Sequence, residues 1–465
     1  FAGGVVFTFL LSGRVETSSI VLPLCVLSIL LSAYIVGRKA VIAALVIPFL
    51  FYFIFKGTGP AIWKSSEAGG LVKSVQSRYG EIWVTKLKGQ FNVYSAGQFL
   101  FSYPNVQAEE LKAHLTISAH PSPENVLIVG GSPGVIREFL KYPIRRLDFV
   151  EIDPELIKTS LSILTSDDRE IIKDKRLNII AEDGRRHINS LRAPAYDLIV
   201  LNLSGPSTAN MNRFYTVEFF SEAKDTLKEG GVLALSLPAS AGYVGRRMQL
   251  ANGAIFNSLK SVFGYVEATT EEYGGLFASQ GPIDVHPDVM KKRFEGLKFK
   301  TAYFYGYILS DAFMPLRAGL YKQRLGAVKA ENSDMKPAAY LYNLMLWAEV
   351  HGGGALNSLL GLGNYVAYFV LMLFVLVLLT VIKKRRRTLY YSIFTTGYAG
   401  MAFTLALILG YQAAYGYIYE MIGLMTALFM AGALAGTFEM PPAMYGVRGL
   451  IVLEISAAAF AAMSP

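Results

Sequence analysis

The chain has 465 residues, of which 53% are hydrophobic, so it is too apolar for one soluble domain and too long for one compact core. Its formal net charge is +9, but +6 of this lies within residues 1–56 and 356–465, which leaves only +3 for the middle. This distribution argues against a nucleic-acid surface. The single cysteine, Cys25, excludes a disulfide framework, and the five histidines show no metal-ligand spacing, so we expect no metal.

Apolar runs long enough to cross a bilayer occur toward both ends of the chain. They predict six transmembrane helices, at 16–35, 40–56, 361–382, 389–410, 416–436 and 447–463. A shorter apolar run that starts at Phe1 would make a seventh. Because both ends of the sequence lie at apolar runs, we expect them to be cuts through a longer multi-pass protein of the inner or plasma membrane. The lipid bilayer is therefore the first expected partner.

Two short basic segments predict the orientation of this protein. They are Gly37-Arg38-Lys39 and the run from Lys383 to Arg387, and such loops are enriched on the cytoplasmic side. Counting helices from either segment places the intervening part of the chain outside the cytoplasm.

The middle of the chain carries two kinds of pattern. Alternation in EIWVTKLKG and QFNVYSAGQFLF predicts a small antiparallel sheet, followed by a helix through Glu109 and Glu110. Apolar strands VLIV, LDFVEI, LNIIAED, YDLIVLNL and GGVLALSL then alternate with helices, which predicts a parallel sheet covered on both faces. The expected organisation is transmembrane helices in 1–56, a β-hairpin subdomain with its linking helix in 66–119, a doubly wound α/β domain in 120–350, and transmembrane helices in 358–465.

Ligands of such sheets bind beyond the carboxyl ends of the strands, and three successive loops there have suitable residues. The first is a glycine loop containing Gly130, Gly131 and Gly134, which permits close backbone approach before a helix N-terminus. Glu151, in the second loop, could accept hydrogen bonds from both ribose hydroxyls, whereas the nearby Asp153 is suited to capping the helix that starts at Pro154.

The third loop is Glu182-Asp183-Gly184, where a carboxylate could accept a hydrogen bond from an exocyclic amine such as that of adenine. Asp183 could equally cap the next helix, and the sequence leaves these two roles open. The fourth loop, Asn202 to Thr208, has no carboxylate at the position where chemistry usually occurs.

Taken together, these segments resemble the polyamine aminopropyltransferases, the spermidine and spermine synthases, and more closely a membrane-embedded, transporter-fused branch of them. The resemblance covers roughly residues 74–350 and includes the segments HPSPENVLIVGGSPGVIRE, DFVEIDPELI, AEDGRR and NSDMKPAAYLYN. It implies a Rossmann-like fold, similar to that of S-adenosylmethionine-dependent methyltransferases, inserted between groups of transmembrane helices. It also implies binding of decarboxylated S-adenosylmethionine or its product methylthioadenosine, with the three glycines beside the amino-acid side of the nucleoside, Glu151 on the ribose and Asp183 on adenine.

The chain departs from this family where an amine would react. Asn202 and Gly205 stand at the positions of two aspartates in the fourth loop, and Ala108-Glu109-Glu110 replaces a Tyr-His-Glu segment. An attacking amine must lose a proton, and an amide cannot accept it. The remaining catalytic candidates are Asn202, Tyr215, Glu109 and Glu110, whereas Asp197 begins its strand and should lie at the wrong end.

The sequence leaves three functions open. The first is a membrane-bound aminopropyltransferase acting on a polyamine, with Glu109 or Glu110 gripping the amine. The second is a non-catalytic nucleoside- or polyamine-binding domain attached to a transporter-like bundle. The third is an assembly module in a homo-oligomer or membrane complex, with a vestigial pocket.

Overall fold

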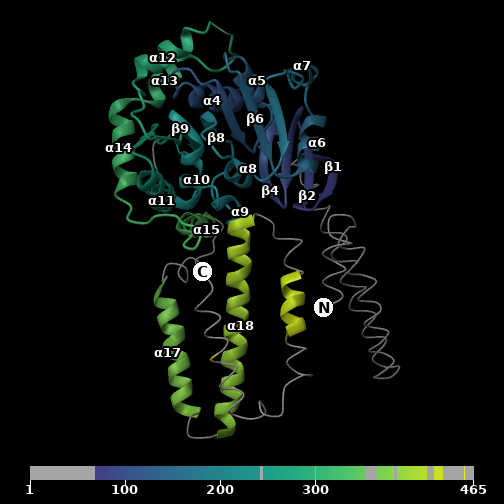
Figure 1. Ribbon diagram of the computed structural model, residues 1–465, viewed down its shortest axis with the longest axis vertical. Coiled ribbons are helices and arrows are strands. Elements are labelled where there is room, and N and C mark those ends of the chain that lie inside the picture. Colours follow the sequence, from purple (N-terminus) through teal and green to yellow (C-terminus); the bar gives the residue numbers. More distant parts are fainter. Residues whose placement is uncertain are drawn as a thin grey trace, which may run out of the picture. The chain divides into compact units, whose positions relative to one another are not determined.

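The computed structural model describes residues 69–240, 244–298, 300–350, 364–381, 385–415, 424–432 and residue 455. The chain divides into two compact units (Figure 1). The larger unit holds both β-sheets, within residues 69–207 and 211–339, and the other holds the described helices beyond residue 340. The expected domain 1–56 lies outside the described residues.

The first sheet consists of four antiparallel strands in chain order, β1 (Gly70–Ser77), β2 (Gly80–Leu87), β3 (Gln90–Ser95) and β4 (Gln98–Tyr103). Two of its turns, Lys88-Gly89 and Ala96-Gly97, have positive φ at both residues, which suits the tight hairpin between twisted strands. The buried side of this sheet packs against Leu156 and Leu164, which belong to the α/β domain. The small sheet therefore stands beside the helix that follows the second strand of the main sheet.

The second sheet has seven strands in the order β10-β11-β9-β8-β5-β6-β7. The strands are β5 (Asn125–Val129), β6 (Arg146–Glu151), β7 (Leu177–Ala181), β8 (Tyr196–Leu201), β9 (Leu227–Ser236), β10 (Tyr265–Ala268) and β11 (Gly275–Ser279). Strands β5 to β9 run parallel to one another, as the alternation of strands and helices predicts. The result is a Rossmann-like, methyltransferase-like domain.

The prediction of a purely parallel sheet is wrong at one edge. Strand β11 pairs antiparallel with β9, and β10 pairs antiparallel with β11, so the sheet is mixed. These two strands have only 4 and 5 residues and are joined by a short loop that ends at Gly274, with φ of 61°. Such short strands carry too little pattern to identify, and their hairpin-like connection lacks the helix of a parallel crossover.

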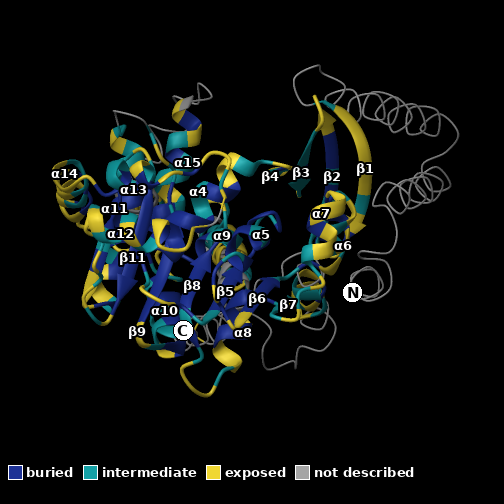
Figure 2. Ribbon diagram, turned by 90° about the horizontal axis from the view of Figure 1, so that it is seen from above, coloured by how far each residue is buried: buried dark blue, intermediate teal, exposed yellow. Residues whose placement is uncertain are grey.

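Helices cover both faces of the main sheet. Figure 2 shows α4 and α5 on one side and α8 and α10 on the other. The helices of this region are α4 (Val106–Ile117), α5 (Val135–Leu140), α6 (Pro154–Ser162), α7 (Ser166–Ile171), α8 (Gly184–Ser190), α9 (Ala209–Asn212), α10 (Val217–Thr226), α11 (Arg246–Val262), α12 (Pro287–Glu295), α13 (Gly306–Ala312) and α14 (Pro315–Gly326). Five of them begin at a capping side chain that accepts a backbone N–H, namely Asn105, Asp153, Thr165, Asp183 and Thr216.

Residues 332–334 form hydrogen bonds that hold the loop before α10 in place. The Asn332 side chain donates to Asn212 Oδ1 and to the Tyr215 carbonyl oxygen, at 3.0 and 2.8 Å. Two residues later, Asp334 accepts two hydrogen bonds from Arg185, which also forms two with Glu222. The Asn-Ser-Asp segment noted in the sequence thus joins α8, α10 and the loop between β8 and α10.

The other unit contains most of α15 (Ala338–Val350), together with α17 (Asn364–Val381) and α18 (Arg385–Tyr415). Helices α17 and α18 contact each other through Phe374, whose ring lies 5.2 Å from that of Tyr398 and 6.1 Å from that of Phe394. No helix among the described residues is long and apolar enough to cross a bilayer. The spans expected at 361–382 and 389–410, which correspond to α17 and α18, are therefore not confirmed. The expected spans 16–35 and 40–56 lie outside the described residues, as do most of 416–436 and all of 447–463 except residue 455.

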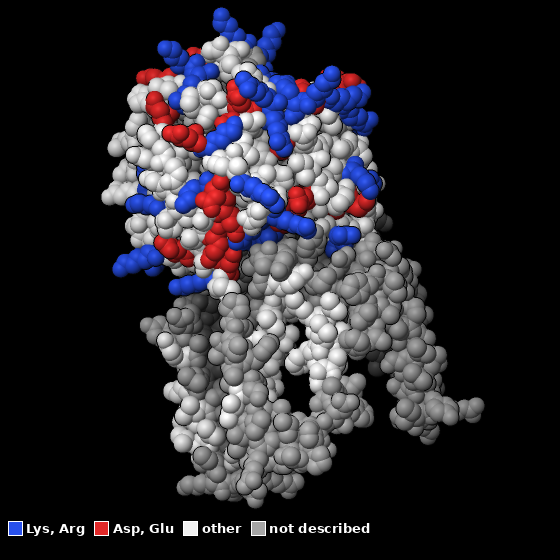
Figure 3. Space-filling model, in the orientation of Figure 1, with Lys and Arg blue, Asp and Glu red and all other residues white. Residues whose placement is uncertain are grey.

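The surface of the sheet-bearing unit carries side chains of both signs on the face drawn in Figure 3. The unit has exposed ion pairs between residues three apart in the sequence, such as Lys173 with Glu170 at 2.7 Å and Lys158 with Glu155 at 2.6 Å. Pairs of this kind contribute little to stability because water screens them.

We predict that Arg185→Met lowers the free energy of unfolding by about 3 kcal/mol, near the lower end of the cost of unpairing a buried charge, because Glu222 and Asp334 retain some access to water. The control Lys173→Met removes an exposed pair and should change it by less than about 0.5 kcal/mol. Urea unfolding followed by circular dichroism measures both. Equal urea midpoints for the two variants would contradict the role of residues 332–334 in joining α8, α10 and the loop before α10.

Candidate active site

Four loops meet at one edge of the main sheet. They follow β5, β6, β7 and β8, which are neighbours in the sheet, and the last residues of these strands are in register. Val129 pairs with both Val150 and Leu201, and Glu151 pairs with Ala181. The predicted convergence of the glycine loop, the Glu151 loop, the Asp183 loop and the Asn202 loop is therefore present.

The glycine loop approaches the fourth loop closely. Gly130 and Gly131 have φ of 69° and 81°, and Gly130 N donates to the Val150 carbonyl oxygen at 2.8 Å. A Cβ atom on Gly131 would lie 2.5 Å from Asn202 Nδ2 and nearer still to the Asn202 carbonyl oxygen. Glycine is therefore required here for both its backbone conformation and its lack of a side chain.

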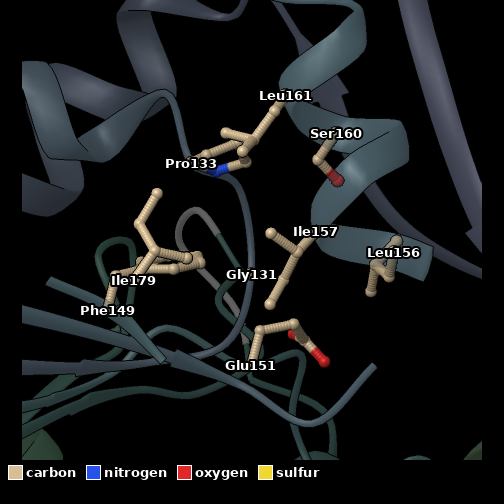
Figure 4. A pocket seen from close by; sticks show the side chains of 9 residues that line it. All are labelled: Gly131, Pro133, Phe149, Glu151, Leu156, Ile157, Ser160, Leu161 and Ile179. Carbon is tan, nitrogen blue, oxygen red and sulfur yellow. The ribbon is translucent and has the colours of Figure 1, made fainter. Parts of the chain in front are cut away.

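A hollow lies between this loop and α6 (Figure 4). The space there that is not filled by atoms, including open solvent, amounts to about 280 Å³. Its wall is mostly apolar, with the Glu151 carboxylate as its acidic group, and the lining residues are Gly131, Pro133, Phe149, Glu151, Leu156, Ile157, Ser160, Leu161 and Ile179. An apolar slot with one carboxylate suits a flat base attached to a sugar.

Glu151 lies at the carboxyl end of β6, and its Oε1 accepts a hydrogen bond from Asp153 N at 3.2 Å. Surrounding protein raises its pKa to about 7, chiefly because burial disfavours the charged form. Asp153 itself caps α6 by accepting from Glu155 N at 2.9 Å, as the sequence suggested. Of these two acids, only Glu151 lines the hollow.

Asp183 has two protein partners. One carboxylate oxygen caps α8 by accepting from Arg186 N at 2.9 Å, and the other pairs with the buried Arg213. The capping alternative is therefore realised, and an adenine amine would have to share the carboxylate with Arg213. A Cβ atom on Gly184 would lie 2.6 Å from Val129 Cγ1, so this glycine lets α8 approach β5.

The Asn202 amide is engaged on both sides. Its Nδ2 donates to the Gly130 carbonyl oxygen at 2.9 Å, and its Oδ1 accepts from Lys112 Nζ at 2.8 Å. Sequence reasoning missed Lys112, although a lysine three residues after Glu109 lies on the same face of a helix. Burial lowers the pKa of Lys112 to about 8.

The two neighbouring glutamates of α4 differ in their surroundings. Glu110 accepts backbone hydrogen bonds from Ala302, Tyr303 and Phe304 at 2.7 to 2.9 Å, so it holds a turn in place. Glu109 instead lies against Gly134, where a Cβ atom would be 2.9 Å from its Oε2.

Glu109 is 2% exposed, and its Oε2 has no hydrogen-bond partner among the described residues. Arg137 approaches that oxygen at 3.6 Å. Burial nevertheless raises the pKa of Glu109 to about 7. The structure thus brings Glu109, and not Glu110, to the glycine loop as a carboxylate able to take a proton.

The other candidates lie around the fourth loop. Tyr215 is fully buried, and its hydroxyl donates to the Ser204 carbonyl oxygen at 3.3 Å. Its role is therefore to hold the fourth loop in place. Gly205 lies close to Pro238, since a Cβ atom on Gly205 would be 3.1 Å from Pro238 Cδ. Asp197 accepts from Asn125 N at 2.7 Å at the start of β5, the opposite end of the sheet from the hollow. Within the described part of the chain, no cluster of three or more His, Cys, Asp or Glu side chains could hold a metal ion.

Part of the chain is similar in sequence to known proteins. Residues 106–242 match the spermine/spermidine synthase domain family. A polyamine aminopropyltransferase of Korarchaeum cryptofilum is 29% identical over 206 residues, which cover 42% of this chain and 62% of that protein. A polyamine aminopropyltransferase of Prochlorococcus marinus strain MIT 9312 is 39% identical over 127 residues, covering 27% of this chain and 44% of that protein. The matches thus span about half to three-fifths of these relatives.

Solved structures with a similar chain course include a spermidine synthase from Thermotoga maritima, with a TM-score of 0.45 and 21% identity. The similarity covers 55% of this chain and 87% of that structure. A spermidine synthase in complex with the transition state analogue AdoDATO has a TM-score of 0.47 and 21% identity, covering 55% of this chain and 88% of that one. In sequence, residues 106–242 are thus similar to the spermine/spermidine synthase domain, and the chain is similar to polyamine aminopropyltransferases over part of their length.

Proposed function

We propose that this domain transfers the alkyl chain of a sulfonium nucleoside to an amine and releases methylthioadenosine. The donor named by the resemblance is decarboxylated S-adenosylmethionine, and the names of the relatives point to a polyamine as the acceptor. The observation that carries the proposal is Glu109, a buried carboxylate against the glycine loop whose Oε2 accepts no hydrogen bond from the described residues and whose pKa is raised to about 7. A general base works best when its pKa lies near the working pH.

The nucleoside fits the hollow in one orientation. Glu151 is the acid that lines it and would accept hydrogen bonds from the ribose hydroxyls, while Leu156, Ile157 and Ile179 would contact the base. The 5′ chain would then pass Gly131 toward Asn202. In this pose the reacting carbon approaches the side of the glycine loop where Glu109 lies.

The reaction needs little from the protein beyond placement and one proton acceptor. The amine arrives as an ammonium and loses a proton to Glu109, since a free lone pair is required for attack. Its nitrogen bonds to the chain carbon next to sulfur, and the carbon–sulfur bond breaks with its electron pair on sulfur. The leaving group, methylthioadenosine, is neutral at sulfur, so no acid is needed to expel it.

A second candidate function is nucleoside binding without turnover. It is favoured by the Asn202 amide, whose oxygen and nitrogen both already have protein partners, and by the lack of a carboxylate in the fourth loop. In that case the domain would regulate or assemble with the helical unit. Binding of methylthioadenosine without release of product from any amine would support it.

We also propose that the chain is anchored in the bilayer, with the sheet-bearing unit outside the cytoplasm. The apolar runs and the two basic segments of the sequence support this. Large apolar side chains on α17 are exposed within its unit, among them Phe369 (60%), Leu373 (50%) and Leu379 (60%), and exposed apolar surface of this kind marks a contact with lipid or protein.

Glu109→Gln should lower the rate of methylthioadenosine release by at least about 100-fold, because an amide cannot take the proton of the amine. The assay supplies S-adenosylmethionine or its decarboxylated form with a panel of diamines and polyamines. Glu170→Gln, on the exposed surface, is the matched control and should keep wild-type rates. If Glu109→Gln releases methylthioadenosine at the wild-type rate, Glu109 is not the proton acceptor of the reaction.

Binding of methylthioadenosine should weaken as pH falls below about 7. The ionised Glu151 accepts hydrogen bonds from both hydroxyls, whereas the protonated acid cannot, so bound ligand favours the charged form of a group whose pKa is raised to about 7. Affinity should be flat above that pH and fall up to about tenfold per unit below it. Calorimetry from pH 5.5 to 8.5 measures this, and Glu151→Gln should abolish the pH dependence while Glu109→Gln retains it.

The anchoring proposal predicts that the full-length protein stays with membranes after washing with high salt and with alkaline carbonate. Protease added to intact spheroplasts should then cleave the sheet-bearing unit, because that unit would face outward. Release of the protein by carbonate would contradict the anchoring. Cleavage only after the spheroplasts are broken would contradict the orientation.

A further inference from the structure

The site contains a positive charge of its own. Lys112, on α4, donates through Nζ to Asn202 Oδ1 at 2.8 Å, and Asn202 in turn binds the Gly130 carbonyl oxygen. The ammonium group therefore lies one side chain away from the glycine loop. No carboxylate of the described residues forms an ion pair with it within 4.0 Å, and Glu109 on the same helix pairs with Arg137.

This charge affects the choice of ligand. Burial lowers the pKa of Lys112 to about 8, so the group is still mostly protonated at pH 7. A decarboxylated sulfonium nucleoside brings two positive charges, one on sulfur and one on its terminal amine, next to this lysine. A ligand that keeps the carboxylate at the end of its chain would instead supply the anion that Lys112 lacks.

We propose that the nucleoside ligand of this site carries a carboxylate at the end of its 5′ chain, as S-adenosylmethionine does, and that Lys112 pairs with it. The inference rests on the proposed nucleoside site and revises only its donor. The group transferred is then 3-amino-3-carboxypropyl. The amine nitrogen bonds to the chain carbon next to sulfur, the carbon–sulfur bond breaks toward sulfur, methylthioadenosine leaves, and Glu109 holds the proton of the amine.

A simpler role for Lys112 is to hold Asn202 in place. The two roles differ in what they do to ligands of different charge. A lysine that only supports the loop affects every nucleoside equally, whereas a lysine that binds a carboxylate affects only ligands that have one. S-Adenosylhomocysteine, its decarboxylated analogue and methylthioadenosine share the same thioether nucleoside and differ in the group on sulfur, which is 3-amino-3-carboxypropyl, 3-aminopropyl and methyl, respectively. Only the first has a carboxylate, so the three compounds separate these roles.

The test is calorimetric binding of these three compounds to the full chain and to Lys112→Met. The wild type should bind S-adenosylhomocysteine at least about tenfold more tightly than the decarboxylated analogue, the size expected for a charge-assisted contact. Lys112→Met should bind S-adenosylhomocysteine about 10- to 100-fold more weakly and methylthioadenosine within about twofold of wild type. Lys112→Arg should keep the preference, and Lys158→Met, which removes an exposed lysine of α6, should bind all three ligands as the wild type does.

Each other result has a definite meaning. If none of the three compounds binds the wild type, the proposed nucleoside site itself fails. If methylthioadenosine binds but the wild type prefers the decarboxylated analogue, the inference is overturned and the proposed function stands. An equal loss for all three ligands in Lys112→Met, with unfolding unchanged, would also overturn it, because Lys112 would then only support Asn202.

Discussion

The close crossing of two loops at Gly130-Gly131 and Asn202 is the contact on which the rest of the site depends. A left-handed backbone at both glycines lets the loop after β5 touch the loop after β8, and a Cβ atom at Gly131 would separate them. With this crossing, Gly131 faces the hollow together with Glu151, whereas Gly134 lies against Glu109 of α4. Every group to which we assign chemistry lies next to it, either on the sheet edge or on α4.

Burial gives these groups their chemical character. Glu109 and Glu151 have pKa values raised to about 7, and that of Lys112 falls to about 8, so three ionisable groups titrate near neutral pH at one edge of the sheet. Perturbed groups gathered in this way are typical of functional sites, although structural ion pairs also perturb pKa values. The ion pairs of Asp183 with Arg213 and of Arg185 with Asp334 fix the loops around the site.

Local sequence pattern was sufficient for the parallel strands, the cap of α6 and the order of the loops. The continuous apolar strands identify β5 to β9, and Asp153 before Pro154 identifies the start of α6. Long-range pairing could not be read in this way. Glu110 binds residues 302–304, almost 200 positions away, and Arg213 pairs with Asp183, 30 positions earlier, so neither partner is marked by local spacing. Lys112 was overlooked because a lysine in a helix is usually solvated, and only the fold places it against Asn202.

The account depends most on a nucleoside occupying the hollow beside Glu151. The most direct measurement is an experimental structure of the protein with methylthioadenosine. We predict the ribose hydroxyls within hydrogen-bond distance of the Glu151 carboxylate, the base against Ile157 and Ile179, and the thioether beyond Gly131. A nucleoside bound elsewhere, or a hollow that stays closed at saturating ligand, would contradict it.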